Sequence, residues 1–241
     1  MLNSMYRDDN GIPAFAVRVY AADITGTPTE KWYERMPQSR KVKIDKLKRE
    51  DDRKRGILSY ALLETGMKDL AKDLGDDVAK LVDGELPDIC TDENGKPYFA
   101  DSPVRFNISH SGDRVMVAIS SQDVGCDVEK RCSNAENVAK RFFHEKEYAA
   151  IAAANDDIRD DLFRTLWTLK ESVVKCSGQG LRSELGSFCV VDDEGRILRS
   201  ITVGGRSVCH IRTYDIDDGY SYSVCSTYDK IEDKIRWISI T

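Results

Sequence analysis

Alternating apolar and polar residues predict a series of short β-strands. The segments with this pattern are FAVRVY (15–20), VRFNIS (104–109), RVMVAIS (114–120), VGCDVE (124–129), and HIRTYDI and YSYSVCSTY within 210–228. Only the short polar turns HSGD and SQD separate the second, third and fourth segments, so these three are expected to form a meander. SFCVVDDEGRILRS (187–200) predicts a hairpin that turns at D-E-G.

Helical periodicity fills the stretches between the predicted strands. The basic region leads into RGILSYALLETGMKDLAKDLG, a predicted helix with Gly75 as its stop, and further helices are expected over 135–155 and about 162–176. Helices and antiparallel hairpins that alternate in clumps are typical of the α+β class. The order of elements permits two similar halves, 1–122 and 123–241.

Composition and cysteine usage narrow the class of protein. The chain of 241 residues is 41% apolar and 32% charged, and it has no apolar run long enough for a membrane span. Its first residues, MLNSMYRDDNGIPAF, lack the apolar core of a signal peptide, so export is not expected. Seven cysteines, none spaced C-x-x-C, favour reduced thiols in a cytoplasm over a disulfide framework or a structural zinc site.

Charge is unevenly distributed along the chain. The net charge is −6, yet residues 31–55 contain eleven Lys/Arg against five acids, which leaves this window at +6. Such a patch on an acidic protein indicates a phosphate-bearing ligand or an acidic partner rather than general nucleic-acid binding. On charge alone, a solvated helix face explains the window equally well.

The acidic residues suggest a cation site. Asp127 and Glu129 share one face of their predicted strand, where two like charges are unfavourable unless something neutralises them. On the 162–176 helix, Lys170 lies inside the apolar arc and Glu171 lies at its margin. Three carboxylates from two elements form the oxygen-ligand set that Mg²⁺ prefers, although a snorkelling lysine and a surface glutamate would be the ordinary interpretation.

Four motifs carry a resemblance to a known family. FNISHSG, VGCDVE, RFFHEKEY and LWTLKESVVKCSGQGL, in this order and spacing, resemble the phosphopantetheinyl transferases of the surfactin-synthetase type. NGKPYF, SFCV and DDGYSYSVCS extend the resemblance over nearly the whole chain. It implies two similar α+β halves with the cofactor in the cleft between them. It also implies an enzyme that moves the 4′-phosphopantetheine group of coenzyme A to a serine of an apo acyl or peptidyl carrier protein and releases 3′,5′-adenosine bisphosphate.

The resemblance also implies roles for individual residues. Asp127, Glu129 and Glu171 match the metal-binding acids and would hold Mg²⁺, with Mn²⁺ also possible. Glu147 matches the proposed general base, and Lys170 matches a lysine near the reacting phosphate. The expected contacts to coenzyme A are Arg40, Lys43, Arg55, Lys96, Ser109, His110 and Lys175. The chain departs from the family at Gly56, where a Ser or Thr is common, and Trp167, Phe142 and Phe143 are interpreted as core.

Two alternatives remain open. An Mg²⁺-dependent nuclease or phosphohydrolase would use the same acids, but it would want an E-x-K motif where this chain reads D-x-E-K. A non-catalytic relative would keep the fold and bind only a partner. The family resemblance implies a monomer, and it leaves the natural carrier protein open.

Overall fold

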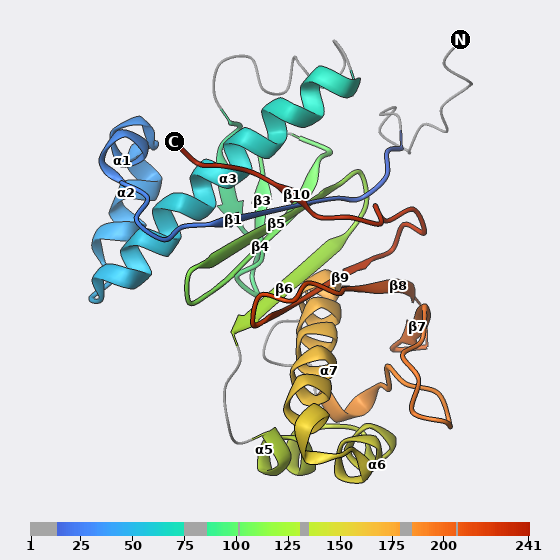
Figure 1. Ribbon diagram of the computed structural model, residues 1–241. Coiled ribbons are helices and arrows are strands. Elements are labelled where there is room, and N and C mark those ends of the chain that lie inside the picture. The colour runs from blue at the N-terminus through green and yellow to red at the C-terminus, as the bar shows by residue number, and fades with distance from the viewer. Residues whose placement is uncertain (1–13, 75–85, 101, 131–134, 179–184, 206) are drawn as a thin grey trace.

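The computed structural model of the chain describes residues 14–74, 86–100, 102–130, 135–178, 185–205 and 207–241 (Figure 1). The first part comprises β1 (Arg18–Asp23), α1 (Glu30–Arg35), α2 (Gln38–Asp45), α3 (Glu50–Leu74), β2 (Ile89–Thr91), β3 (Pro97–Phe99), β4 (Arg105–Ser111) and β5 (Arg114–Ser120). The second comprises β6 (Val124–Lys130), α5 (Ala135–Phe142), α6 (Glu145–Ala153), α7 (Asp156–Ser177), a short 3₁₀ turn (Leu185–Ser187), β7 (Ser200–Val203), β8 (Ser207–Tyr214), β9 (Tyr220–Ser226) and β10 (Arg236–Trp237).

Two four-stranded sheets pack between two long helices. The strand orders are β10-β1-β5-β4 and β6-β9-β8-β7, with α3 on the outer face of the first sheet and α7 on the outer face of the second (Figure 1). Alternation along β5 explains the layering, because Val117 and Ile119 pack toward α3 whereas Met116 and Ala118 pack toward the second sheet. The predicted α+β class is confirmed.

The predicted meander is wrong in its third strand. β4 and β5 pair antiparallel as expected, but the SQD turn carries the chain into the other sheet, where β6 pairs with β9. Side chains of β4 bind the amides on the remaining edge of β6: Asn107 Oδ1 accepts from Cys126 N at 3.0 Å, and Ser109 Oγ accepts from Val128 N at 3.3 Å. The two sheets therefore meet along β4 and β6 through side chains rather than through a backbone ladder.

The two halves repeat one order of elements. Apart from α1 and α2, the first half has the order β1, α3, the β2–β3 hairpin, β4 and β5. Apart from α5, α6 and β7, the second has the matching order β6, α7, the hairpin bridged at Val191 and Ile197, β8 and β9. The first strand of each set pairs antiparallel with the last. The hairpin turns also match, since Asp92 Oδ1 and Asp192 Oδ1 each accept hydrogen bonds from the amides two and four residues later.

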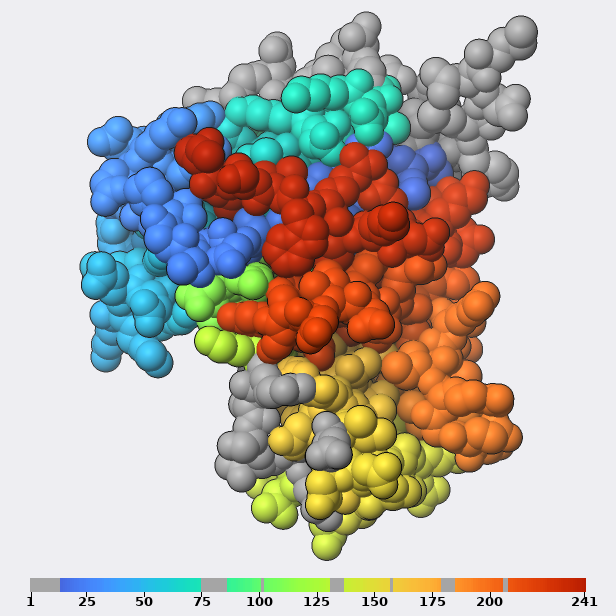
Figure 2. Space-filling model, in the orientation of Figure 1, coloured from blue at the N-terminus to red at the C-terminus, as the bar shows by residue number. Residues whose placement is uncertain are grey.

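The C-terminal residues leave the second half and join the first. β10 pairs in parallel with β1, and the amide of Ile238 donates to Ala21 O at 2.9 Å. In Figure 2 this red segment lies against the blue and cyan N-terminal part of the molecule. The pairing crosses the division expected at residue 122, which stays a prediction.

The helices differ from expectation mainly at their ends. α3 begins at Glu50 and α7 at Asp156, both earlier than predicted, and the expected stop at Gly75 lies outside the described residues. The predicted 135–155 helix breaks in two because His144 caps α6: its Nδ1 accepts from Lys146 N, and its own amide donates to Glu147. No helix among the described residues has the length and apolarity needed to cross a membrane.

Candidate active site

A pocket opens where β4, β6 and α7 meet. It has a volume of 330 Å³ and is lined by Ile108, Ser109, His110, Asp127, Glu129, Trp167, Glu171 and Lys175. A second pocket of 300 Å³ shares Ile108, Glu171 and Lys175 with it and extends to the turn at residues 94–97. All three predicted metal-binding acids and four of the seven predicted coenzyme A contacts line these two pockets.

Strand alternation and a glycine assemble the acidic wall. Cys126 and Val128 are buried between the two sheets, which leaves Asp127 and Glu129 on the pocket side, as predicted. α7 can lie close to β6 because Gly125 has no side chain: a Cβ there would stand 2.1 Å from the carbonyl oxygen of Ser172. This close approach brings Glu171 and Lys175 beside Asp127.

Lys175 is held at the centre of the site by three acceptors. Its Nζ lies 2.6 Å from Asp127 Oδ1, 3.1 Å from Ser109 Oγ and 3.2 Å from Cys126 O. Ser109 Oγ in turn donates to Asp127 Oδ1 at 2.8 Å. Burial opposes the charged form of Lys175, but the ion pair with Asp127 outweighs it, so the pKa of Lys175 is raised.

Glu129 and Glu171 lie in surroundings that disfavour their charged forms. Burial raises the pKa of Glu129, although a hydrogen bond from Ser111 Oγ at 2.7 Å partly offsets this. Burial also raises the pKa of Glu171, and the nearby charge of Asp127 adds to the shift. Both carboxylates would therefore gain from a cation in the pocket.

The donor set fits a divalent cation. Asp127 Oδ2 is buried and has no hydrogen-bond partner among the described residues. Three carboxylates against the Lys175 ammonium leave two negative charges uncompensated, and oxygen ligands suit Mg²⁺ or Mn²⁺. Across the described part of the chain, the only trio of possible ligand atoms within 4.8 Å of one another belongs to three cysteines. The carboxylates are thus more widely spaced, which suits an ion such as Mg²⁺ that keeps several of its waters.

The predicted cofactor contacts are divided between the pockets and α2. Lys96 lines the second pocket and its Nζ donates to Cys176 O at 2.8 Å. Arg55, in the first turns of α3, donates to Gly112 O at 3.2 Å, directly beyond the His110 strand. Arg40 is half-buried and Lys43 is exposed on α2, and neither is among the residues that line the two pockets. Burial lowers the pKa of Arg40.

Glu147 and Lys170 form a buried ion pair outside both pockets. Both side chains are 0% exposed, and Lys170 Nζ lies 2.7 Å from Glu147 Oε2 and 2.8 Å from Phe188 O. Glu147 also accepts from the backbone amides of His144 and Val190. The interpretation of Lys170 as a snorkelling lysine is therefore wrong, since its ammonium stays inside the core.

The structure also decides the three aromatic residues interpreted as core and the departure from the family at Gly56. Trp167 lines the first pocket and also stacks on Phe143 at 6.2 Å, so it belongs to both the site and the core. Phe143 is buried as predicted, but the interpretation of Phe142 as core is wrong, because 44% of it is exposed. At Gly56, a Cβ would lie 2.5 Å from Ile44 Cδ1, so the α2 side chain occupies the space that a hydroxyl residue would need.

The two pockets contain carboxylates that suit a divalent cation and lysines that suit phosphate groups. Together they define a candidate phosphate-transfer site. The sequence pattern of the 4′-phosphopantetheinyl transferase superfamily matches residues 123–225, which include β6 and α7 with the three acids. The chain is 39% identical over 151 residues to the 4′-phosphopantetheinyl transferase Sfp of Bacillus subtilis, a match that covers 62% of this chain and 67% of that protein. It therefore belongs to the 4′-phosphopantetheinyl transferase superfamily.

Further relatives agree over a shorter stretch. The 4′-phosphopantetheinyl transferase gsp of Aneurinibacillus migulanus is 32% identical over 139 residues, which are 58% of each chain. The matched regions thus span about two thirds or less of these relatives' lengths. Among solved structures, the holo-[acyl-carrier-protein] synthase of Thermotoga maritima aligns with a TM-score of 0.34 and 17% identity, over 43% of this chain and 61% of that one.

Proposed function

We propose that this chain transfers the 4′-phosphopantetheine group of coenzyme A to a serine of an apo carrier protein and releases 3′,5′-adenosine bisphosphate. Membership of the superfamily supports the reaction class. One observation carries the assignment to this pocket: Oδ2 of Asp127 is buried without a partner among the described residues, in a site with two uncompensated negative charges. Such a site favours a divalent cation and the phosphates that accompany it.

The reaction is a displacement at phosphorus. The serine hydroxyl oxygen forms a bond to the phosphorus that carries pantetheine, the bridging P–O bond of the pyrophosphate breaks, and the adenosine bisphosphate leaves with the electron pair. Mg²⁺ held by Asp127, Glu129 and Glu171 would supply charge neutralisation on the pyrophosphate oxygens. Catalysis of this kind depends chiefly on positioning and electrostatics.

Cationic and hydroxyl groups around the pocket would orient the cofactor. Lys175 and His110 line the first pocket, Lys96 lines the second, and Arg55 is tied to the adjoining turn. Ammonium and guanidinium groups bind phosphate oxygens through charge-assisted hydrogen bonds. Arg40 and Lys43 on α2 are proposed as further contacts to the cofactor phosphates.

The serine must lose its proton, and Glu147 is the proposed acceptor, with Lys170 proposed near the reacting phosphate. Both groups are buried between α6 and α7, where each is the other's ion-pair partner. As placed, they support the site by fixing α6 against α7, the helix that carries Glu171. Direct contact with substrate would require α6 to move away from α7.

The metal ion, the acceptor protein, the cellular location and the oligomeric state of the protein are also proposed. We propose Mg²⁺ as the ion, with Mn²⁺ as an alternative, acyl or peptidyl carrier proteins as acceptors, and a cytoplasmic monomer. One chain suffices because β4 of the first half and β6 and α7 of the second build the pocket together. The proposal includes no nucleic acid and no membrane partner.

The test is direct transfer to carriers. The protein is incubated with coenzyme A, Mg²⁺ and a panel of apo carrier proteins, and the carriers are then weighed intact by mass spectrometry. We expect one carrier class to gain the mass of one phosphopantetheine and to lose this gain when EDTA is present. Coenzyme A bound without transfer to any carrier would favour the non-catalytic relative, and hydrolysis of coenzyme A without carrier modification would favour a phosphohydrolase.

A further inference from the structure

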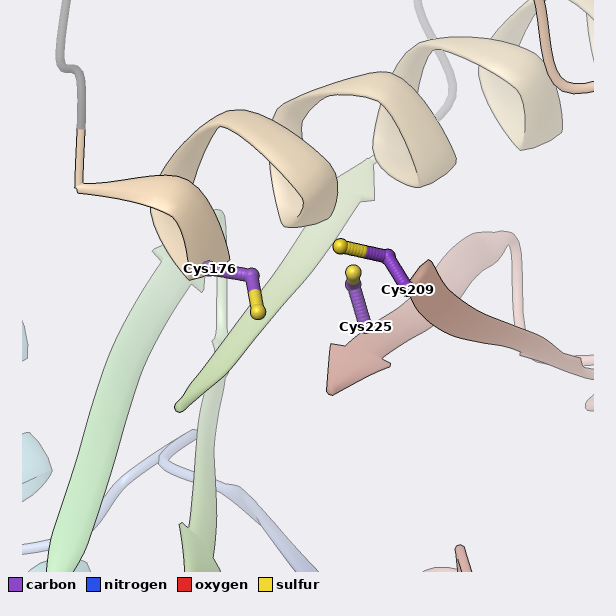
Figure 3. Close-up of side chains that lie close together, drawn as sticks. All are labelled: Cys176, Cys209 and Cys225. Carbon is purple, nitrogen blue, oxygen red and sulfur yellow. The ribbon is translucent and has the colours of Figure 1, made fainter. Parts of the chain in front are cut away.

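Three cysteine thiols converge in the core of the second half. Cys176 near the end of α7, Cys209 on β8 and Cys225 on β9 have sulfur atoms that all lie within 4.8 Å of one another. Figure 3 shows the three side chains pointing into one space between the helix and the two strands. All three are buried, and none is in a disulfide.

The fold aligns these thiols although the sequence separates them. β8 and β9 pair with Ile211 opposite Cys225, so Cys209, two residues before Ile211, lies on the same sheet face as Cys225. That face packs on α7, where Cys176 occupies the last turn. The absence of C-x-x-C spacing argues against a local metal motif, but it has no bearing on a site assembled from three elements.

The three thiols perturb one another's ionisation. Interaction with the Cys176 and Cys225 thiols lowers the pKa of Cys209. The same interactions, together with burial, raise the pKa values of Cys176 and Cys225, and the ammonium of Lys96, 2.8 Å from the carbonyl oxygen of Cys176, offsets only part of the shift at Cys176. The trio therefore favours one thiolate at a time, and a bound cation would be needed to hold all three.

We propose that Cys176, Cys209 and Cys225 bind one thiophilic d¹⁰ metal ion, Zn²⁺ or Cu⁺, through three thiolates. Soft sulfur ligands select such ions and discriminate against the Mg²⁺ that suits the carboxylate pocket. A metal–sulfur distance of about 2.3 Å places three sulfurs in a plane about 4.0 Å apart, so shifts within an ångström would convert the observed arrangement into a site.

Charge and proton balance are consistent with a divalent ion. Binding displaces the protons of the three thiols, and a divalent ion with three thiolates carries one net negative charge, which the Lys96 ammonium offsets. Cu⁺ would leave two negative charges, of which the Lys96 ammonium offsets one. No cysteine is among the residues that line the two pockets, and Lys96, which lines the second pocket and contacts the Cys176 carbonyl, is the one side chain shared with the proposed cofactor site.

The experiment titrates reduced protein with Cd²⁺, a spectroscopic substitute for Zn²⁺, in the presence of saturating Mg²⁺ to occupy the carboxylate pocket. We expect one equivalent of ion to produce a thiolate-to-metal charge-transfer absorption. Cys225→Ser should lose this absorption. Cys90→Ser is the matched control, because it removes a half-buried thiol on β2 outside the trio, and it should retain the absorption.

A second measurement does not depend on a variant that folds. X-ray absorption of the wild-type protein loaded with Zn²⁺ or with Cu⁺ should show three sulfur neighbours, and competition between the two ions identifies which one is preferred. Absorption that persists in Cys225→Ser, or a bound ion surrounded mainly by oxygen and nitrogen, would overturn the proposal. So would the absence of a thiolate band with every ion.

Discussion

Single residues set the balance of charge in the pocket. Lys175 binds Asp127 through Oδ1, while Oδ2 of the same carboxylate is buried without a partner among the described residues. Asp127 can therefore hold the lysine and a cation at the same time, one on each oxygen. The sequence indicated the shared face of Asp127 and Glu129, but the link to Lys175 depends on how α7 packs.

Asp127→Asn should abolish transfer and leave the fold intact. The amide keeps the shape of the side chain but withdraws one charge from the cation, and removing such an electrostatic contribution typically costs about 10²–10³-fold in rate. Initial rates of carrier modification, compared with thermal melting, measure the two effects separately. Asp193→Asn, at a side chain that is 79% exposed, should behave like wild type. A wild-type rate in Asp127→Asn would remove this carboxylate from the site.

The raised pKa values of Glu129 and Glu171 predict a pH-dependent response to Mg²⁺. Between the ordinary and the raised pKa, the folded cation-free protein holds more protons than the unfolded chain, so its stability falls as the pH rises. Mg²⁺ requires the deprotonated acids and reverses this loss. The increase in melting temperature on adding Mg²⁺ should therefore be larger at about pH 8 than at about pH 5. An equal increase at both values would contradict the shifts.

Glu147→Gln should destabilise the protein strongly. The substitution leaves the Lys170 ammonium in the core without its carboxylate, and breaking a buried pair in this way costs about 3–5 kcal/mol. Denaturant unfolding measures the loss, and Glu147→Gln combined with Lys170→Met should recover much of it. If the folded double variant also keeps the wild-type dependence of transfer rate on pH, Glu147 is not the proton acceptor.

Local sequence patterns predict most of the strands but not how the strands pair. Alternation predicts β4, β5, β6, β8 and β9, because each strand has two different environments on its two faces. The pairing of β6 with β9 was not predictable, since the partner lies about a hundred residues away and the SQD turn is equally compatible with a meander. The break between α5 and α6 was missed because histidine replaces the Ser or Thr of the usual capping box.

The candidate site, like the strand pairing, could be predicted from the sequence only in part. The family resemblance implied roles for the three acids and Lys175, and the structure brings these four side chains to one pocket. The Glu147–Lys170 pair joins residues 23 positions apart on different helices, with no periodic signal to connect them. The cysteine trio likewise depends on three elements, so no linear spacing could have indicated it.

The contact between β6 and α7 gives a prediction at Gly125. Gly125→Ala would push a methyl group into the backbone of Ser172 and Cys176, and such overpacking typically costs about 1–3 kcal/mol. The wider spacing should also weaken Mg²⁺ binding, because Asp127 and Glu171 lie on opposite sides of the contact. Thermal melting with and without Mg²⁺ measures both effects.

Gly56→Ala is the matched control for this prediction. Its methyl group would meet only the flexible end of Ile44, and alanine favours the helix. The control should therefore be much milder in both measurements. Equal effects at the two glycines would show that the close approach of β6 and α7 is not what positions the acids.

At the scale of the whole molecule, the C-terminal segment fastens the first half. Arg236 Nη1 lies 3.0 Å from Asp69 Oδ2 and 3.7 Å from Asp73 Oδ2, both on α3. Ile240 is 6% exposed and belongs to the core between α3 and the first sheet. Residues that look like a tail in the sequence are thus part of the packed interior.

Ile240→Ala should lower stability although it lies one position from the end of the sequence. Truncating a buried isoleucine typically costs about 2–5 kcal/mol. Denaturant unfolding measures the change. Thr241→Ala should be silent, because Lys31 binds the backbone oxygen of Thr241 rather than its side chain. Equal stabilities would place Ile240 outside the cooperative core.

The return of β10 to β1 has a consequence for how the chain acquires its structure during synthesis. The sheet that β1 begins is completed only after the ribosome has produced all of the second half. The first half therefore cannot finish folding as it emerges, even though it contains its own helix and hairpins. An internal repeat suggests two units that fold one after the other, but this connection makes their final assembly a single late event.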